Sequence, residues 1–146
     1  MVRIARRLII LVLSFLLISA NCFATEIGVV IDDKNIEFDV PPSIQNGRTL
    51  VPVRKIFEEL DCDVEWLGES QTVIATQNSK IIALRIGINR MIRTDIETGI
   101  SEVFEIDVPP IVQNGRTLVP VRVISEALNY FVDWDAETNM VIIKTQ

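Results

Sequence analysis

Two acidic triplets are the first residues of this chain whose spacing could do chemistry. In each triplet the carboxylates alternate with other residues: Asp61, Asp63 and Glu65, then Asp133, Asp135 and Glu137. In an extended segment, alternate side chains share one face and lie about 6.5–7 Å apart. Such a face could hold Ca²⁺, although neither triplet has the glycine turn of an EF-hand loop. We expect two solvated strand faces, with a weak divalent-cation site as the alternative.

Paired carboxylates also occur in glycoside hydrolases, where one of them acts as an acid because its pKa is raised. No feature of the sequence predicts such a shift. The chain has no histidine, and no serine or cysteine lies in a setting that would activate it as a nucleophile. We therefore predict no catalytic residues, no metal-binding residues and no cofactor, and we expect that the protein is not an enzyme. A hydrolase of unrecognised type remains the alternative.

Two tryptophans could be platforms on which sugar rings stack in a cell-wall binder. Trp66 follows Val64 by two residues, and Trp134 follows Val132 in the same way. In a strand, each tryptophan would share the face of its valine. Large aromatic side chains on such an apolar face commonly pack in the core. We predict that both tryptophans are buried.

Six charged residues close to turns could form a ligand-recognition set: Arg48, Arg54, Arg116, Arg122, Asp39 and Asp107. Residues of opposite charge near loop ends also form ion pairs and hydrogen bonds that hold those loops in place. We expect the second arrangement, with ion pairs and hydrogen bonds that pin the loop ends of each repeat.

That repeat is an internal duplication. The segment from Phe38 to Arg54 matches the segment from Ile106 to Arg122 at 14 of 17 positions, with an offset of 68 residues. A match of this kind indicates one supersecondary unit that is present twice. Most of the repeated residues are turn-formers or apolar strand residues, so the duplication predicts how the chain folds and does not identify a ligand.

The residue pattern of each copy predicts strands, then a short helix and then further strands. Asn46-Gly47 favours a tight turn, because both residues tolerate positive φ. The helix has one apolar face with the spacing i, i+3, i+4 and i+7: Val53, Ile56, Phe57 and Leu60. It is too short to persist alone, so it must lie on a sheet. We predict one α+β domain, an antiparallel β-sheet twisted around short helices, built from two tandem pseudo-repeats at about 27–77 and 80–146.

The pattern Val-Pro-Pro, then Asn-Gly-Arg-Thr-Leu-Val-Pro-Val-Arg, a short helix and Val-x-Trp occurs twice at the same spacing. On these motifs, residues 26–146 resemble the copper amine oxidase N-terminal (stalk) domain family. The resemblance implies an antiparallel sheet around a helix, in a domain that is common in exported bacterial proteins. It departs from the family after each helix, where Asp61 and Asn129 replace the usual glycine.

The resemblance does not imply copper chemistry. In copper amine oxidases, the copper and the quinone cofactor belong to a separate catalytic domain, and imidazoles hold the metal. This chain has no histidine. The quinone forms from a tyrosine in an Asn-Tyr-Asp/Glu context, whereas Tyr130 follows Asn129 but precedes Phe131. The resemblance thus implies no amine oxidase activity, and Tyr130 is expected to be a loop or edge aromatic.

Residues 1–24 have the pattern of a secretory signal peptide. Three arginines precede an apolar run, and Cys22-Phe23-Ala24 is the best cleavage region. A helix from Leu8 to Ala20 is about 20 Å long, which is short for a bilayer core of about 30 Å. No stable membrane span is therefore expected after cleavage. A twin-arginine signal at Arg6-Arg7 and lipidation of Cys22 are the alternatives.

Cleavage after residue 24 removes three of the 14 basic residues and none of the 20 acidic ones, which leaves a net charge of 11 − 20 = −9. A surface with this charge repels nucleic acid and anionic lipid. Cys62 is then the one remaining cysteine, so no internal disulfide can form. We expect Cys62 to be buried, with an intermolecular disulfide or a reactive thiol as the alternative.

Together these features predict a non-catalytic extracytoplasmic interaction or stalk module that is exported and is extracellular or associated with the cell envelope. Its expected partner is an unknown protein or a cell-wall polymer, or a second copy of the chain in a homodimer. The alternative is a structural fragment with no ligand of its own.

Overall fold

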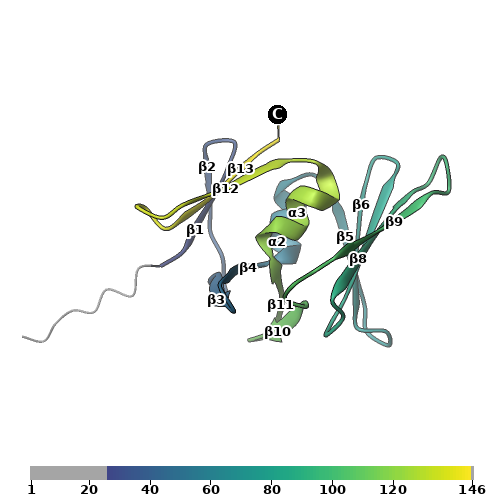
Figure 1. Ribbon diagram of the computed structural model, residues 1–146, viewed down its shortest axis with the longest axis horizontal. Coiled ribbons are helices and arrows are strands. Elements are labelled where there is room, and N and C mark those ends of the chain that lie inside the picture. The colour runs from purple at the N-terminus through teal and green to yellow at the C-terminus, as the bar shows by residue number, and fades with distance from the viewer. Residues whose placement is uncertain (1–25, 146) are drawn as a thin grey trace, which may run out of the picture.

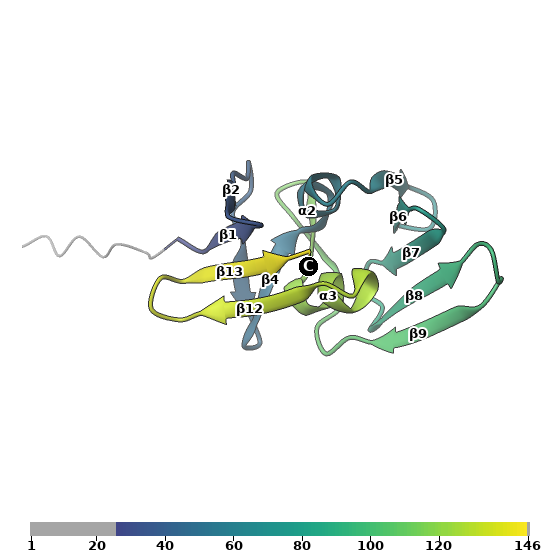
Figure 2. The ribbon, with the colours of Figure 1, turned by 90° about the horizontal axis from the view of Figure 1, so that it is seen from above.

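Two short helices lie between three β-sheets in the computed structural model, which describes residues 26–145 (Figure 1 and Figure 2). The helices are α2 (Val53–Glu59) and α3 (Val121–Leu128). No described helix is both long enough and apolar enough to cross a membrane. The signal peptide predicted for residues 1–24 lies outside the described residues.

One sheet, here called the terminal sheet, joins strands from both ends of the chain in the order β12-β13-β1-β2. Its strands are β1 (Gly28–Ile31), β2 (Lys34–Ile36), β12 (Phe131–Asp135) and β13 (Met140–Lys144). β1 and β13 run parallel, with Val29 opposite Val141. The other strand pairs of this sheet are antiparallel.

The other two sheets are antiparallel throughout. The hairpin sheet has the order β10-β11-β4-β3, from β3 (Ser43–Gln45), β4 (Arg48–Pro52), β10 (Ile111–Gln113) and β11 (Arg116–Pro120). The five-stranded sheet follows chain order from β5 to β9, with β5 (Asp63–Leu67), β6 (Thr72–Gln77), β7 (Lys80–Arg85), β8 (Arg90–Asp95) and β9 (Ser101–Glu105). In Figure 1 the helices separate the terminal sheet from the five-stranded sheet.

The α+β class is confirmed, but the prediction of a single sheet is wrong. Ile36, Phe38 and Val40 alternate with acidic residues, a pattern that predicts a strand with one buried face, but the hydrogen-bonded ladder ends at Ile36. Pro41 and Pro42 follow, and proline has no N–H to donate to a neighbouring strand. The chain therefore leaves the terminal sheet and begins the hairpin sheet at Ser43.

The helices bury the apolar faces that the sequence predicts. In α2, Val53, Ile56 and Phe57 are all completely buried. The helix ends with a left-handed residue, Asp61, at φ 57°. There the N–H of Cys62 donates to the carbonyl of Phe57 at 2.9 Å, which is the long hydrogen bond of a Schellman motif. Asn129 has the same φ after α3, so both residues adopt the backbone conformation for which glycine is usual.

Strand pairing interlocks the two halves of the chain. β4 pairs with β11, with Val51 opposite Val119. β1 pairs with β13, and β6 pairs with β7. Every sheet therefore contains strands from both sides of the turn between Gln77 and Lys80, and neither side has all of its strand partners.

Separate expression of residues 25–78 and 79–146 is therefore expected to give two polypeptides without cooperative melting transitions in circular dichroism. Each half would expose the strand edges and apolar faces that the other half covers. An equimolar mixture should recover β-sheet signal. Two fragments that each melt cooperatively would contradict the interlocked arrangement.

Candidate functional site

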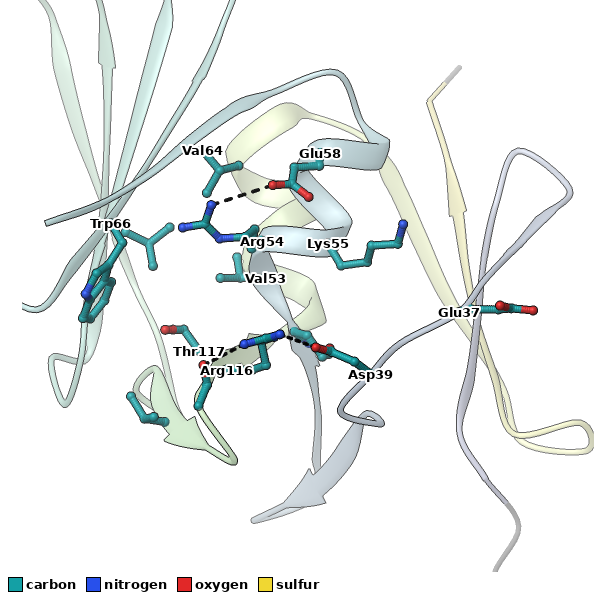
Figure 3. Close-up of a pocket in the computed structure, with 14 residues that line it drawn as sticks. Glu37, Asp39, Val53, Arg54, Lys55, Glu58, Val64, Trp66, Arg116 and Thr117 are labelled. Carbon is teal, nitrogen blue, oxygen red and sulfur yellow. Dashed lines mark hydrogen bonds and ion pairs between the residues drawn. The ribbon is translucent and has the colours of Figure 1, made fainter. Parts of the chain in front are cut away.

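A groove of about 740 Å³ opens between α2, the five-stranded sheet and the β10–β11 hairpin (Figure 3). Its volume lies within the range of about 300–1,000 Å³ that is typical of small-molecule sites. One wall is apolar and comes from four elements of secondary structure: Val53, Val64, Trp66, Val73 and Val112.

The polar part of the groove carries equal numbers of acidic and basic residues: Glu37, Asp39, Glu58, Arg54, Lys55 and Arg116. Arg54 and Glu58 are one helical turn apart on α2 and lie 3.8 Å apart. Arg116 reaches from β11 to Asp39, and Figure 3 shows this pair at the base of the groove below α2. The groove therefore presents guanidinium and carboxylate groups side by side.

Lys55 also has a carboxylate partner, Glu59, with Nζ 2.7 Å from Oε1. Glu59 also forms an ion pair with Lys34, whose Nζ lies 2.6 Å from Oε2. Hydrogen bonds from Lys34 and then Lys55 lower the pKa of the Glu59 carboxyl, and the bond that Lys55 donates to Glu59 raises the pKa of Lys55. Each of the three basic residues that line the groove is thus paired with an acid.

Two reciprocal ion pairs join the copies of the duplicated segment. Arg116 pairs with Asp39, and Arg48 pairs with Asp107, its Nε donating to Oδ2 at 2.7 Å. Ion pairs at the loop ends of each repeat were expected, and the structure adds that the partners come from different copies. β4 begins at Arg48 and β11 begins at Arg116. Because the two strands are antiparallel, each of these arginines lies just beyond the last residue of the neighbouring strand. Each arginine therefore reaches the other copy.

The predicted burial of the two tryptophans is wrong. Trp66 is 40% exposed and Trp134 is 37% exposed. Trp66 lies on β5 and Trp134 lies on β12, and each of these strands is at an edge of its sheet. An edge strand has a neighbour on one side only, so its side chains are covered less than those of a central strand. Trp66 lines the groove, which leaves the sugar-platform interpretation open.

The acidic triplets do not form the predicted extended faces. Asp61 lies in the left-handed turn after α2, and Glu137 lies in the turn after β12. The Asp135 carboxylate accepts hydrogen bonds from the Glu137 N–H at 2.9 Å and the Thr138 hydroxyl at 2.6 Å. These bonds, the one from the Thr138 hydroxyl first, lower the pKa of Asp135. In residues 26–145 no three His, Cys, Asp or Glu side chains are grouped so that they could hold a metal ion.

Cys62 is buried, as predicted. Desolvation, aided by the negative charges of Asp61 and Asp63, raises the pKa of its thiol to about 11. Tyr130 lies in the loop between α3 and β12, as expected, and packs against the core. Its hydroxyl accepts a hydrogen bond from the Gln77 side chain at 3.2 Å. Neither residue lines the groove.

The sequence singled out four of the groove residues: Trp66, Arg54, Arg116 and Asp39. It missed Lys55 and Glu58, which the i, i+4 spacing of acids and bases on the helix could have indicated. No local pattern could have indicated Val112 or Thr117, because only the β4–β11 pairing brings the second hairpin to the first helix.

A family model described as the copper amine oxidase N-terminal domain matches residues 30–145. A search of curated proteins finds no match to the chain.

Replacement of either tryptophan should cost less stability than the loss of a buried aromatic. Trp66→Ala and Trp134→Ala are each expected to lower the free energy of unfolding by less than the about 3–5 kcal/mol of a buried tryptophan. Ile124→Ala, at a completely buried residue, is the control and should cost about 2–5 kcal/mol. Urea denaturation measures all three. A larger loss for Trp66→Ala than for Ile124→Ala would show that the indole is a core side chain.

The reciprocal ion pairs should contribute to acid sensitivity. Hydrogen bonds from Arg116 and Arg48 lower the pKa values of Asp39 and Asp107. A carboxylate with a lowered folded-state pKa stabilises the fold above its unfolded-state pKa of about 3.9. That contribution is lost as the pH falls through the folded-state value. The double variant Asp39→Asn/Asp107→Asn should therefore show a shallower fall of melting temperature than the parent chain below about pH 5.

The effect will be modest, because both pairs are exposed to solvent. The matched control is Asp63→Asn/Glu65→Gln, which removes two charges from exposed residues of β5. If the melting temperatures of both double variants depend on pH in the same way, the reciprocal pairs do not contribute specifically to acid sensitivity.

The Cys62 thiol should be inert in the folded protein. With a pKa of about 11, its thiolate fraction at pH 8 is at least about a hundredfold below that of an ordinary exposed thiol. Ellman's reagent should react slowly with native protein and at a normal rate in denaturant. Fast labelling of the native protein would instead support the reactive-thiol alternative.

Proposed function

The chain belongs to the copper amine oxidase N-terminal domain family, and from this premise we propose that it is a non-catalytic extracytoplasmic module that binds a polymer of the cell envelope. In copper amine oxidases this domain is separate from catalysis, which fits a stalk module. The extracytoplasmic location rests on the signal-peptide pattern of residues 1–24.

The observation that carries the binding role is the groove around Trp66. It combines about 740 Å³ of space with an indole that is 40% exposed. An exposed aromatic in a concave site gives a ligand apolar contact area, and the neighbouring charges give it hydrogen-bonding partners. A purely structural fragment has no need of either feature.

The proposal includes two tandem pseudo-repeats, at about 27–77 and 80–146. The hairpins β3–β4 and β10–β11 have equivalent registers, with Gln45 opposite Arg48 and Gln113 opposite Arg116. A helix follows each hairpin, and an edge strand with a partly exposed tryptophan follows each helix. This order supports duplication of one unit.

Homodimer formation through the edge strands β5 and β12, which carry the two tryptophans, is disfavoured by charge. Asp63 and Glu65 lie on β5, and Asp133 and Asp135 lie on β12. Acidic residues on an edge strand oppose pairing with another acidic edge. We therefore favour an envelope polymer over a second copy of the chain as the partner.

The test is sedimentation of the mature protein, residues 25–146, with purified peptidoglycan sacculi. We expect the folded protein to sediment with the sacculi, and heat-unfolded protein that is kept soluble serves as the control for nonspecific adsorption. Native mass is measured in parallel. Protein that remains in the supernatant as a monomer would support the structural-fragment alternative, and a dimer in the supernatant would support self-association.

A further inference from the structure

The composition of the groove around Trp66 restricts what it can bind. Its charged residues are three acids and three bases, so their formal charges cancel. A site for an anion or a cation would carry an excess of the opposite charge. Paired carboxylates and guanidinium groups instead offer hydrogen-bond acceptors and donors at fixed positions without a net field. This arrangement suits a neutral ligand that is rich in hydroxyl groups.

The exposed indole gives such a ligand a surface for stacking. A pyranose ring has one face lined by C–H bonds, and that face packs on an aromatic ring while the hydroxyls point outward to polar side chains. Figure 3 shows Trp66 on the five-stranded-sheet side of the groove, with Arg54 and Arg116 toward α2 and β11. An apolar platform thus faces a polar side of the groove, as recognition of a sugar ring requires.

Valine side chains add a third feature. Val64 is partly buried and Val112 is 55% exposed, and both line the same groove as Trp66. The hydroxyl groups of a plain hexose would leave the methyl groups of these two valines without an apolar partner. An acetamido substituent carries a methyl group that can bury against valine and an amide that can hydrogen-bond to charged neighbours.

We propose that this groove binds a neutral glycan that contains N-acetylhexosamine, with Trp66 as the stacking platform and the Asp39–Arg116 and Arg54–Glu58 pairs as hydrogen-bonding partners. This inference rests on the proposed function and names the ligand class of the same site. The net charge of −9 for residues 25–146 is consistent with it, because that charge repels anionic polymers.

The internal duplication provides a natural comparison. At 12 of the 14 lining positions, the same residue type recurs 68 residues away in the sequence. The two differences are Val123 at the position of Lys55 and Ile44 at the position of Val112. At the corresponding positions the charged residues are three acids and two bases: Glu105, Asp107, Glu126, Arg48 and Arg122. The equal number of acids and bases is therefore not repeated at those positions.

A peptide that adds as a strand to β5 is the competing occupant. Such a peptide would pair with the edge that carries Asp63 and Glu65, so it would have to be basic to avoid repulsion. The groove itself has no excess acid to receive basic side chains. The balanced charge therefore favours the glycan.

The test uses calorimetric titration of residues 25–146 with chitohexaose, a neutral N-acetylglucosamine oligosaccharide. The parent chain is expected to bind it, and Trp66→Ala should weaken binding at least about tenfold, because the indole supplies the largest apolar surface of the groove. Trp66→Phe keeps an aromatic face and should bind within about threefold of the parent. Circular dichroism confirms that each variant is folded.

Two variants serve as matched controls. Leu67→Ala changes the next residue of β5, which is 39% exposed and does not line the groove. Trp134→Ala removes a tryptophan of similar exposure on β12, an edge strand of the terminal sheet, also outside the groove. Each should bind chitohexaose within about twofold of the parent, since neither reaches the proposed ligand.

Salt dependence tests the neutrality of the ligand. Raising the salt concentration from about 0.05 M to about 0.5 M should leave the dissociation constant for chitohexaose nearly unchanged, because salt screens charge–charge interactions and this ligand carries no charge. Polygalacturonate, an anionic polysaccharide, should not bind.

Several results would overturn the inference. These are no binding of chitohexaose, equal losses for Trp66→Ala and Trp134→Ala, or binding of a basic strand-forming peptide that Trp66→Ala abolishes. If sacculi retain the parent chain and Trp66→Ala equally and chitohexaose does not bind, the glycan inference fails while the proposed function stands. If sacculi do not retain the parent chain, the proposed function fails as well.

Discussion

The antiparallel pairing of β4 with β11 is the contact on which the other features of this structure depend. It places Val51 opposite Val119 at the centre of the hairpin sheet, where both residues are completely buried. The strands come from the two copies of the duplicated segment, so the contact joins the copies at corresponding residues. A small core beside it takes two residues from each copy: Val40, Leu50, Val108 and Leu118.

The same pairing builds the groove. It brings the β10–β11 hairpin close to the first helix. Arg116 and Val112 of the second copy therefore line one groove with Arg54 and Val53 of the first. Without this contact the residues that line the groove would not lie close together in space. The groove therefore exists only when both copies have assembled.

Helix α2 contributes side chains both to the main core and to the groove. Its inward face buries Ile56 and Phe57 in the main core, while Arg54, Lys55 and Glu58 line the groove. With only seven residues, the helix cannot persist by itself, so tertiary packing must hold its outer face in position. A change that loosens the core beneath the helix would displace the charged residues of the groove.

The sequence by itself determined the local elements: the Asn-Gly turns and the apolar faces of the two helices. These features depend on residues close in the chain, whose periodicity and backbone preferences can be read directly. The tertiary structure alone decided the rest. Periodicity indicates which face of a strand is apolar but not whether another strand covers its edge, so it placed Trp66 in the core when it lies on an open edge. Residue types predicted ion pairs at the loop ends, but only antiparallel pairing between the copies determined that each arginine reaches the other copy's aspartate.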